Sequence, residues 1–110
     1  MDVNLFKGNL DLILLSVLER EGGYGQDIAK RVQVLTGGEI TLNAGSLYPA
    51  LHRLVKAEWV ESTWQESDRG GAPRKYYRLT EGGQAALQTK KAEWQTLRGG
   101  VDALLLGVCA

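Results

Sequence analysis

The segment from Thr41 to Lys56 constrains the fold of this chain most strongly. Its apolar residues recur at spacings of three and four, which predicts an amphipathic helix with one buried face. That face consists of Leu47, Leu51, Leu54 and Val55. Asn43 is suited to cap this helix, because its side-chain oxygen can accept a free backbone N–H of the first turn. Leu42 and Leu47 have the spacing of a hydrophobic staple across the same turn.

The exposed positions near the start of this helix are small or hydrogen-bonding: Ala44, Gly45, Ser46 and Tyr48. A slim, polar first turn can approach another surface closely, and we expect that surface to be DNA. Pro49 breaks a local rule, because proline inside a helix costs roughly 3 kcal/mol. The apolar stripe continues in register across Pro49, which favours one helix with a bent first turn over two separate elements.

Length and composition favour a single small globular domain. The chain has 110 residues, 44% of them hydrophobic and 24% charged, with a formal net charge of zero. No apolar run approaches the roughly 20 residues that span a bilayer, and the first residues lack the layout of a secretory signal. We therefore expect a cytoplasmic protein without a membrane partner. The single cysteine, Cys109, excludes a disulfide framework and is interpreted as incidental.

Two further helices are predicted before Thr41. Leu10 to Glu21 is apolar around most of a helical circumference and ends at Gly22-Gly23, and Tyr24 to Leu35 forms the next helix. With the helix after Thr41, they form the skeleton of a helix-turn-helix domain. The apolar residues Leu5 and Phe6 before these helices need a surface to pack on, which a second subunit could provide.

After Glu58 the apolar period changes from 3.6 to 2. Trp59 to Gln65 is predicted as a strand, Arg74 to Leu79 as a second strand, and the residues between them as a turn. On the first strand, Val60, Ser62 and Trp64 share one face. The segment from Arg69 to Arg78 contains four basic residues and no acid: Arg69, Arg74, Lys75 and Arg78. A basic hairpin after three helices predicts a winged helix.

The last predicted helix begins after Thr80 and has the apolar seam of a coiled coil. Its seam positions are Leu87, Trp94, Leu97, Val101, Leu104 and Val108. This helix could fold back on its own domain, but pairing with a second copy is favoured in so small a protein. Gly99-Gly100 costs about 2 kcal/mol relative to alanines, so the helix bends or ends there. We thus expect a mainly α fold with a small β-hairpin wing, comprising a winged helix-turn-helix DNA-binding domain at 1–80 and a C-terminal dimerisation helix at 81–110.

Three segments together resemble the PadR family of transcriptional regulators: Tyr24-Gly25, the run from Gly45 to Leu54, and the run from Gly70 to Thr80. The length resembles the short subfamily, which has a single C-terminal helix. The resemblance implies a homodimeric winged-helix repressor, and a recognition helix that continues through Pro49. It also implies a dimer interface formed by Leu5, Phe6, Leu87, Trp94, Leu97, Val101 and Leu104. Ala72 departs from the usual wing pattern of that family, which has a basic residue at this position.

A dimer of this kind would place two recognition helices in successive major grooves, roughly 34 Å apart, on an inverted repeat. The residues expected to bind DNA are Asn43, Gly45, Ser46, Tyr48, Pro49, Arg53, Arg74 and Lys75. For Tyr48 two interpretations stay open, a phosphate contact through the hydroxyl and a ring packed on its own domain. Arg74 and Lys75 are expected in or beside a minor groove.

Trp94 also has two interpretations. An indole on a dimer seam is usually core packing, but tryptophans in this part of some members of the resembled family stack on planar drugs. A small planar aromatic effector is therefore a candidate partner, beside double-stranded DNA and a second copy of the chain. The residues needed for an enzyme are missing, since no metal-ligand cluster, nucleophile elbow or phosphate loop occurs in the sequence. We expect no metal and no cofactor. The remaining alternative is a winged helix for protein–protein contact without DNA binding.

Overall fold

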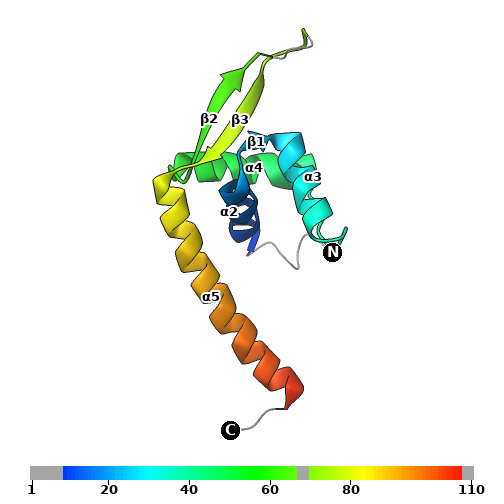
Figure 1. Ribbon diagram of the computed structural model, residues 1–110, viewed down its shortest axis with the longest axis vertical. Helices are drawn as coiled ribbons and strands as arrows, with labels where there is room; N and C mark the ends of the chain where they lie inside the picture. Colours follow the sequence, from blue (N-terminus) through cyan, green and yellow to red (C-terminus); the bar gives the residue numbers. More distant parts are fainter. Residues whose placement is uncertain (1–8, 67–69, 108–110) are drawn as a thin grey trace.

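The computed structural model describes residues 9–66 and 70–107, and it consists of a small body from which a hairpin and a long helix extend in opposite directions (Figure 1). In chain order the elements are α2 (Leu10–Arg20), β1 (Gly23–Tyr24), α3 (Gly25–Leu35), α4 (Ala44–Lys56), β2 (Val60–Gln65), β3 (Arg74–Leu79) and α5 (Glu81–Leu106). The overall dimensions are 61 × 28 × 20 Å. The predicted fold class, mainly α with a small β wing, is confirmed. Leu5, Phe6, Arg69, Val108 and Cys109 lie outside the described residues.

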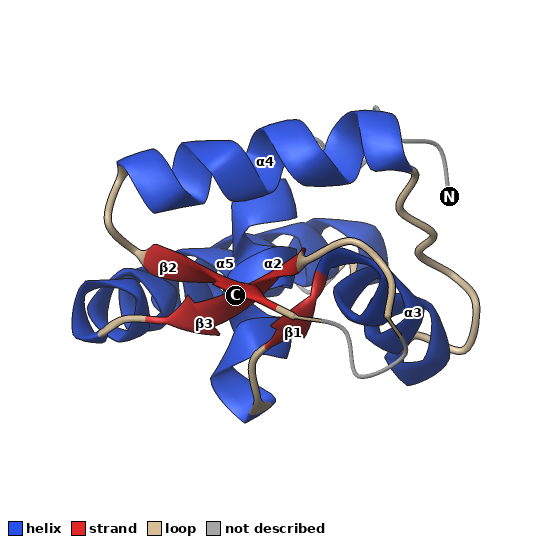
Figure 2. Cartoon of the chain, turned by 90° about the horizontal axis from the view of Figure 1, so that it is seen from above, coloured by secondary structure: helices blue, strands red, loops and turns tan. Residues whose placement is uncertain are grey.

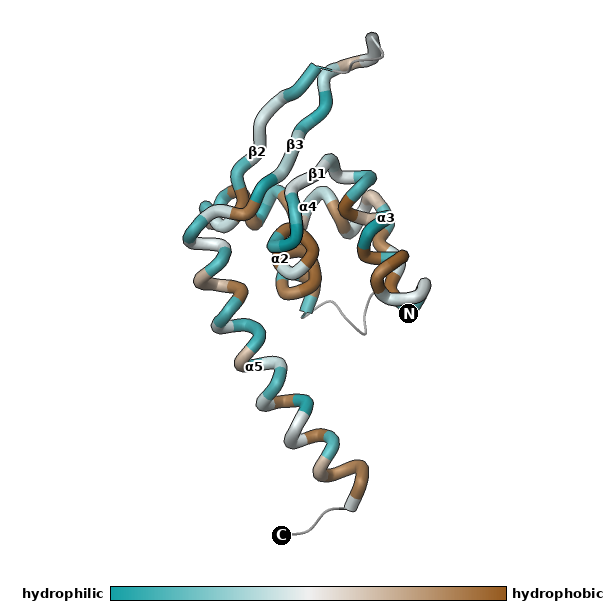
Figure 3. The backbone as a smooth tube through the Cα atoms, viewed as in Figure 1, coloured by the Kyte–Doolittle hydropathy of each residue, from teal (hydrophilic) through white to brown (hydrophobic). Residues whose placement is uncertain are grey.

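The core of the body lies where α2, α3 and α4 meet the base of the sheet. Its fully buried side chains include Leu14 and Leu15 of α2, Ile28 of α3, and Leu51 and Leu54 of α4. Figure 3 shows α2 as largely hydrophobic, as expected for a helix surrounded by the other elements. The predicted helix stripe therefore seats α4 on the core and turns its other side to solvent.

The sheet has three antiparallel strands in the order β1-β3-β2. The hairpin of β2 and β3 was predicted, and its register pairs Val60 with Leu79 and Trp64 with Lys75. The third strand, β1, was not predicted, because two residues are too short to show a period. It pairs Gly23 with Tyr77 and Tyr24 with Tyr76. The helix expected from Tyr24 consequently begins one residue later, at Gly25.

Helix α4 runs unbroken from Ala44 to Lys56 with Pro49 inside it, alongside the sheet (Figure 2). The oxygen of the Asn43 side chain accepts a hydrogen bond from the Ser46 N–H at 2.9 Å, which confirms the predicted cap. After α4 the chain turns sharply through Glu58, whose φ of 64° lies in the left-handed region. This turn delivers the chain directly into β2.

Helix α5 continues through Gly99-Gly100 and ends at Gly107, so the glycine pair does not terminate it. Thr80 caps its start, accepting a hydrogen bond from the Gly83 N–H at 3.0 Å. Only the first half of α5 lies against the body (Figure 1). Leu87, expected in the dimer interface, is fully buried inside its own chain. That expectation was wrong because a heptad pattern does not distinguish packing on the same chain from packing on a partner.

Candidate nucleic-acid interface

The exposed side of α4 carries most of the predicted DNA-binding residues. Asn43, Gly45 and Pro49 are exposed at the start of the helix, and Ser46 is half-buried beside them. The Asn43 side chain forms the cap of the helix, so it positions the first turn. The slim, polar end of a helix is thus free to enter a groove of suitable width.

Tyr48 projects from α4 toward the start of α3 and is 43% exposed. An added Cβ on Gly25 would lie 2.7 Å from the Tyr48 hydroxyl and from the Cε1 of its ring, so only glycine permits this approach. The ring of Tyr48 therefore packs on its own domain, and the residue also lines an open groove, so the phosphate contact stays a prediction.

Arg53, expected to contact a phosphate, forms an ion pair with Asp11 of α2. Its side chain remains 56% exposed, so the pair holds the guanidinium at the surface without burying it.

Arg31 of α3, in contrast, binds the backbone of its own chain. Its two terminal nitrogens donate to the carbonyl oxygens of Glu21 and Gly22 at 2.9 and 3.1 Å, which ties α3 to the turn after α2.

Arg74 and Lys75, the two wing residues expected to bind DNA, lie on opposite faces of β3. Arg74 lies with its guanidinium 3.8 Å from the centroid of the Tyr24 ring, a cation–π arrangement. The Tyr24 hydroxyl in turn donates to Gln65 at 3.0 Å, so Tyr24 spans from β1 to the end of β2. Lys75 points the other way, with its Nζ 5.2 Å from the Trp64 ring. The wing therefore presents positive charge in two directions.

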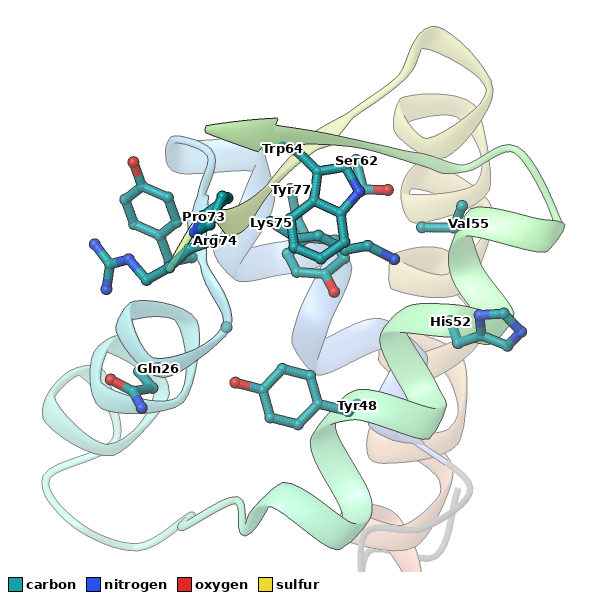
Figure 4. Close-up of a pocket in the computed structure, with 12 residues that line it drawn as sticks. Gln26, Tyr48, His52, Val55, Ser62, Trp64, Pro73, Arg74, Lys75 and Tyr77 are labelled. Carbon is teal, nitrogen blue, oxygen red and sulfur yellow. The ribbon is translucent and has the colours of Figure 1, made fainter. Parts of the chain in front are cut away.

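A groove of about 580 Å³ separates the wing from α4 and the start of α3. Figure 4 shows Trp64, Lys75 and Tyr77 on the wing side of the groove and Tyr48 and His52 on the α4 side. Tyr24, Trp64 and Tyr77 were not among the predicted site residues. The alternation of β2 assigns Trp64 to the same face as Val60, and this pattern was the only sequence signal for its position in the groove. The position of Tyr77 depends on strand pairing and could not be read from the sequence.

A second cavity, of about 480 Å³, lies between α2, α3 and α5 and is lined mostly by apolar side chains. Trp94 forms its α5 wall, opposite Leu12 and Ile13 of α2. Beyond Trp94, the same side of α5 exposes Leu97, Val101 and Leu104 at 56%, 41% and 82%. An apolar helix face of this extent in solvent is typical of an interaction surface.

Within residues 9–66 and 70–107 no group of three or more His, Cys, Asp or Glu side chains could hold a metal ion. None of the helices in those residues is long and apolar enough to cross a membrane.

A recognition helix on a three-helix core, followed by a basic hairpin, defines the winged helix-turn-helix class of DNA-binding proteins. The family model for the "Transcriptional regulator PadR-like family" matches residues 14–89, which is more than half of the chain. The chain therefore belongs to the PadR-like family of transcriptional regulators. Members of this family bind DNA and are regulators rather than enzymes.

Solved structures of similar chains have the same fold. A transcriptional regulator from Clostridium thermocellum is 28% identical with a TM-score of 0.82, covering 90% of this chain and 95% of that one. A PadR family regulator from Eggerthella lenta is 36% identical with a TM-score of 0.78, covering 94% and 87%. The Escherichia coli "Transcriptional regulator YqjI" is 28% identical over 100 residues, and this chain spans 46% of its length.

Proposed function

We propose that this chain is a sequence-specific repressor that binds an inverted-repeat operator as a homodimer. The observation that carries the proposal is the shared groove between α4 and the wing, because it brings Tyr48 and His52 of the helix together with the basic hairpin. Gly45, Ser46 and Pro49 would lie nearest the bases, and Tyr48, Arg53, Arg74 and Lys75 nearest the phosphates. Asn43 would act mainly by fixing the first turn.

The homodimer is supported by the exposed face of α5. Trp94, Leu97, Val101 and Leu104 line one side of a helix that extends beyond its own domain. A second copy would cover this face and supply the second recognition helix. In this proposal residues 1–80 bind DNA and 81–110 form the dimer, although the first turns of α5 also complete the core of the body.

The effector proposal rests on Trp94 and its cavity. A partly exposed indole facing an apolar space of about 480 Å³ is suited to a planar aromatic molecule. Its binding would shift the two wings relative to one another and release DNA. Titration of planar cationic and phenolic compounds, with Trp94 as the only indole, tests this by fluorescence. A flat response across the panel would leave packing as the role of Trp94.

Gel-shift experiments on the DNA upstream of the protein's own gene test the main proposal. We expect a specific shift at an inverted repeat, and lower expression of a reporter placed behind that repeat. Absence of specific binding there and in the neighbouring promoter would favour a winged helix that contacts proteins instead.

Sedimentation velocity tests the dimer. The change Leu97→Glu introduces a charge on the exposed apolar face and should give a monomer with weakened operator binding. Ala92→Glu, on the opposite side of the same helix, is the matched control and should remain dimeric. A dimeric Leu97→Glu protein would place the interface elsewhere.

A further inference from the structure

Tyr77 combines a buried ring with a hydroxyl that opens into the groove between α4 and the wing. The residue is 7% exposed, and its ring belongs to the hydrophobic core. Among the described residues its hydroxyl has no hydrogen-bond partner, and the oxygen keeps some exposure to the groove. A hydroxyl that no described residue satisfies and that is not sealed from solvent is available to a ligand.

The surroundings of this hydroxyl indicate the chemistry of that ligand. The hydroxyl of Tyr48 faces the same groove from α4, and Lys75 extends over it from the wing (Figure 4). The described residues that line the groove include no acid, whereas Lys75 and Arg74 are both basic. Two hydroxyl donors beside an ammonium group suit an anion with several oxygen acceptors.

The protonation state of Tyr77 agrees with a donor role. Burial, and to a smaller extent the nearby Tyr48, raises the pKa of Tyr77 above its usual 10.0. The hydroxyl therefore keeps its proton near neutral pH. It can donate a hydrogen bond without bringing a negative charge toward DNA.

We propose that this groove holds one phosphodiester of the DNA backbone, with Tyr77, Tyr48 and Lys75 as its ligands. Trp64, 68% exposed beside Lys75, covers the adjacent deoxyribose with its ring. The proposal rests on the DNA-binding function proposed above. It adds a contact from a residue of the core, which joins the recognition helix and the wing on a single phosphate.

This geometry explains why a tyrosine stands at a core position. A phenylalanine would fill the same space and would not leave a polar group near the apolar interior. Removing the hydroxyl should therefore leave the fold intact and remove only the interaction with phosphate. Tyr76 offers a matched control, because it neighbours Tyr77 on β3 but faces the other side of the sheet, against Tyr24.

The test compares Tyr77→Phe and Tyr76→Phe in binding to a fluorescent operator and to an unrelated duplex over a range of salt. We expect Tyr77→Phe to weaken binding to both duplexes by about tenfold, with an unchanged melting temperature. Its salt dependence should match that of the original protein, because loss of a neutral donor releases no counterion, whereas Lys75→Ala should lower the slope by about 1. Tyr76→Phe should bind normally. Equal affinity of Tyr77→Phe and the original protein would overturn the proposal.

A second measurement changes the DNA as well as the protein. Replacing the operator phosphates one at a time by neutral methylphosphonates should reveal a position in each half-site that weakens the original protein. At that position the loss of affinity when Tyr77→Phe binds the modified operator should be smaller than the sum of the losses from the two changes made separately. Fully additive losses at every phosphate would also overturn the proposal. If the original protein binds no DNA at all, the proposed function fails first and this site fails with it.

Discussion

The guanidinium of Arg74 rests 3.8 Å from the centre of the Tyr24 ring, on the face of the sheet opposite Lys75. Tyr24 belongs to β1, and the next residue begins α3. The charge at the turn end of the wing strands is therefore positioned by a residue from the helix-turn-helix core. Two adjacent basic residues thus face different parts of the surface that DNA would occupy.

Replacing both wing residues, Arg74→Ala with Lys75→Ala, should weaken binding to all DNA sequences. Each lost phosphate contact should reduce the slope of log affinity against log salt by about 1. Fluorescence anisotropy at several salt concentrations measures both effects. Arg98→Ala removes one positive charge from α5 and serves as a control that should retain the slope. Unchanged affinity and slope in the double variant would remove the wing from the DNA interface.

Gly83→Ala should destabilise the protein by about 1–3 kcal/mol. An added Cβ there would overlap the carbonyl oxygen of Trp59 and lie 2.7 Å from the Leu79 side chain, so α5 would have to move outward. At the neighbouring Gly82 the nearest atom would be 3.6 Å away, and Gly82→Ala should be tolerated. Urea unfolding at fixed protein concentration compares the two. Equal stabilities would show that α5 can shift at no cost.

Glu58→Gly should stabilise the protein by about 1 kcal/mol. The φ of Glu58 is 64°, in a region that disfavours residues with a Cβ and suits glycine at the end of a helix. Ala57, with a φ of −76°, provides the comparison, since Ala57→Gly should lower stability by about 0.5–1 kcal/mol. Thermal unfolding of both variants measures the difference. A destabilised Glu58→Gly protein would assign the Glu58 side chain a role of its own.

Glu19 should make stability depend on pH. Hydrogen bonds from Gln84 and then Lys91 lower the pKa of Glu19 below its usual 4.5. The stabilisation is therefore present above pH 4.5 and is lost as the pH falls through the lowered pKa of the folded state. Chemical unfolding between neutral and acid pH should show Glu19→Gln less stable than the original protein at neutral pH, with the two converging in acid.

The control for that experiment is Glu39→Gln. The Glu39 carboxylate has no ion-pair or hydrogen-bond partner among the residues with described positions. Its variant should follow the original protein at every pH. A Glu19→Gln curve that runs parallel to the original one, without converging, would contradict the linkage.

The sequence predicted the elements whose patterns are local. The period of α4, its Asn43 cap and the alternation of β2 each follow from neighbouring residues, and all are confirmed. Features that need two distant segments were missed. The strand β1 has no periodicity, the partner of Arg53 is 42 residues away, and the burial of Leu87 depends on which surface α5 meets first. The groove lined by Tyr77 and Tyr48 was missed for the same reason, because it forms between distant segments of the chain.

The last turn of α5 exposes Leu104, Leu105 and Leu106 by more than three quarters of each residue. In an isolated chain, these exposed leucines form an apolar patch that favours non-specific association with other apolar surfaces. If two copies cover Leu104 with the rest of the proposed dimer face, the concentration of dimer rises with the square of the chain concentration at low abundance. Cells would then respond steeply to the amount of this protein that they make, and a repressor acting on its own gene would set its own threshold.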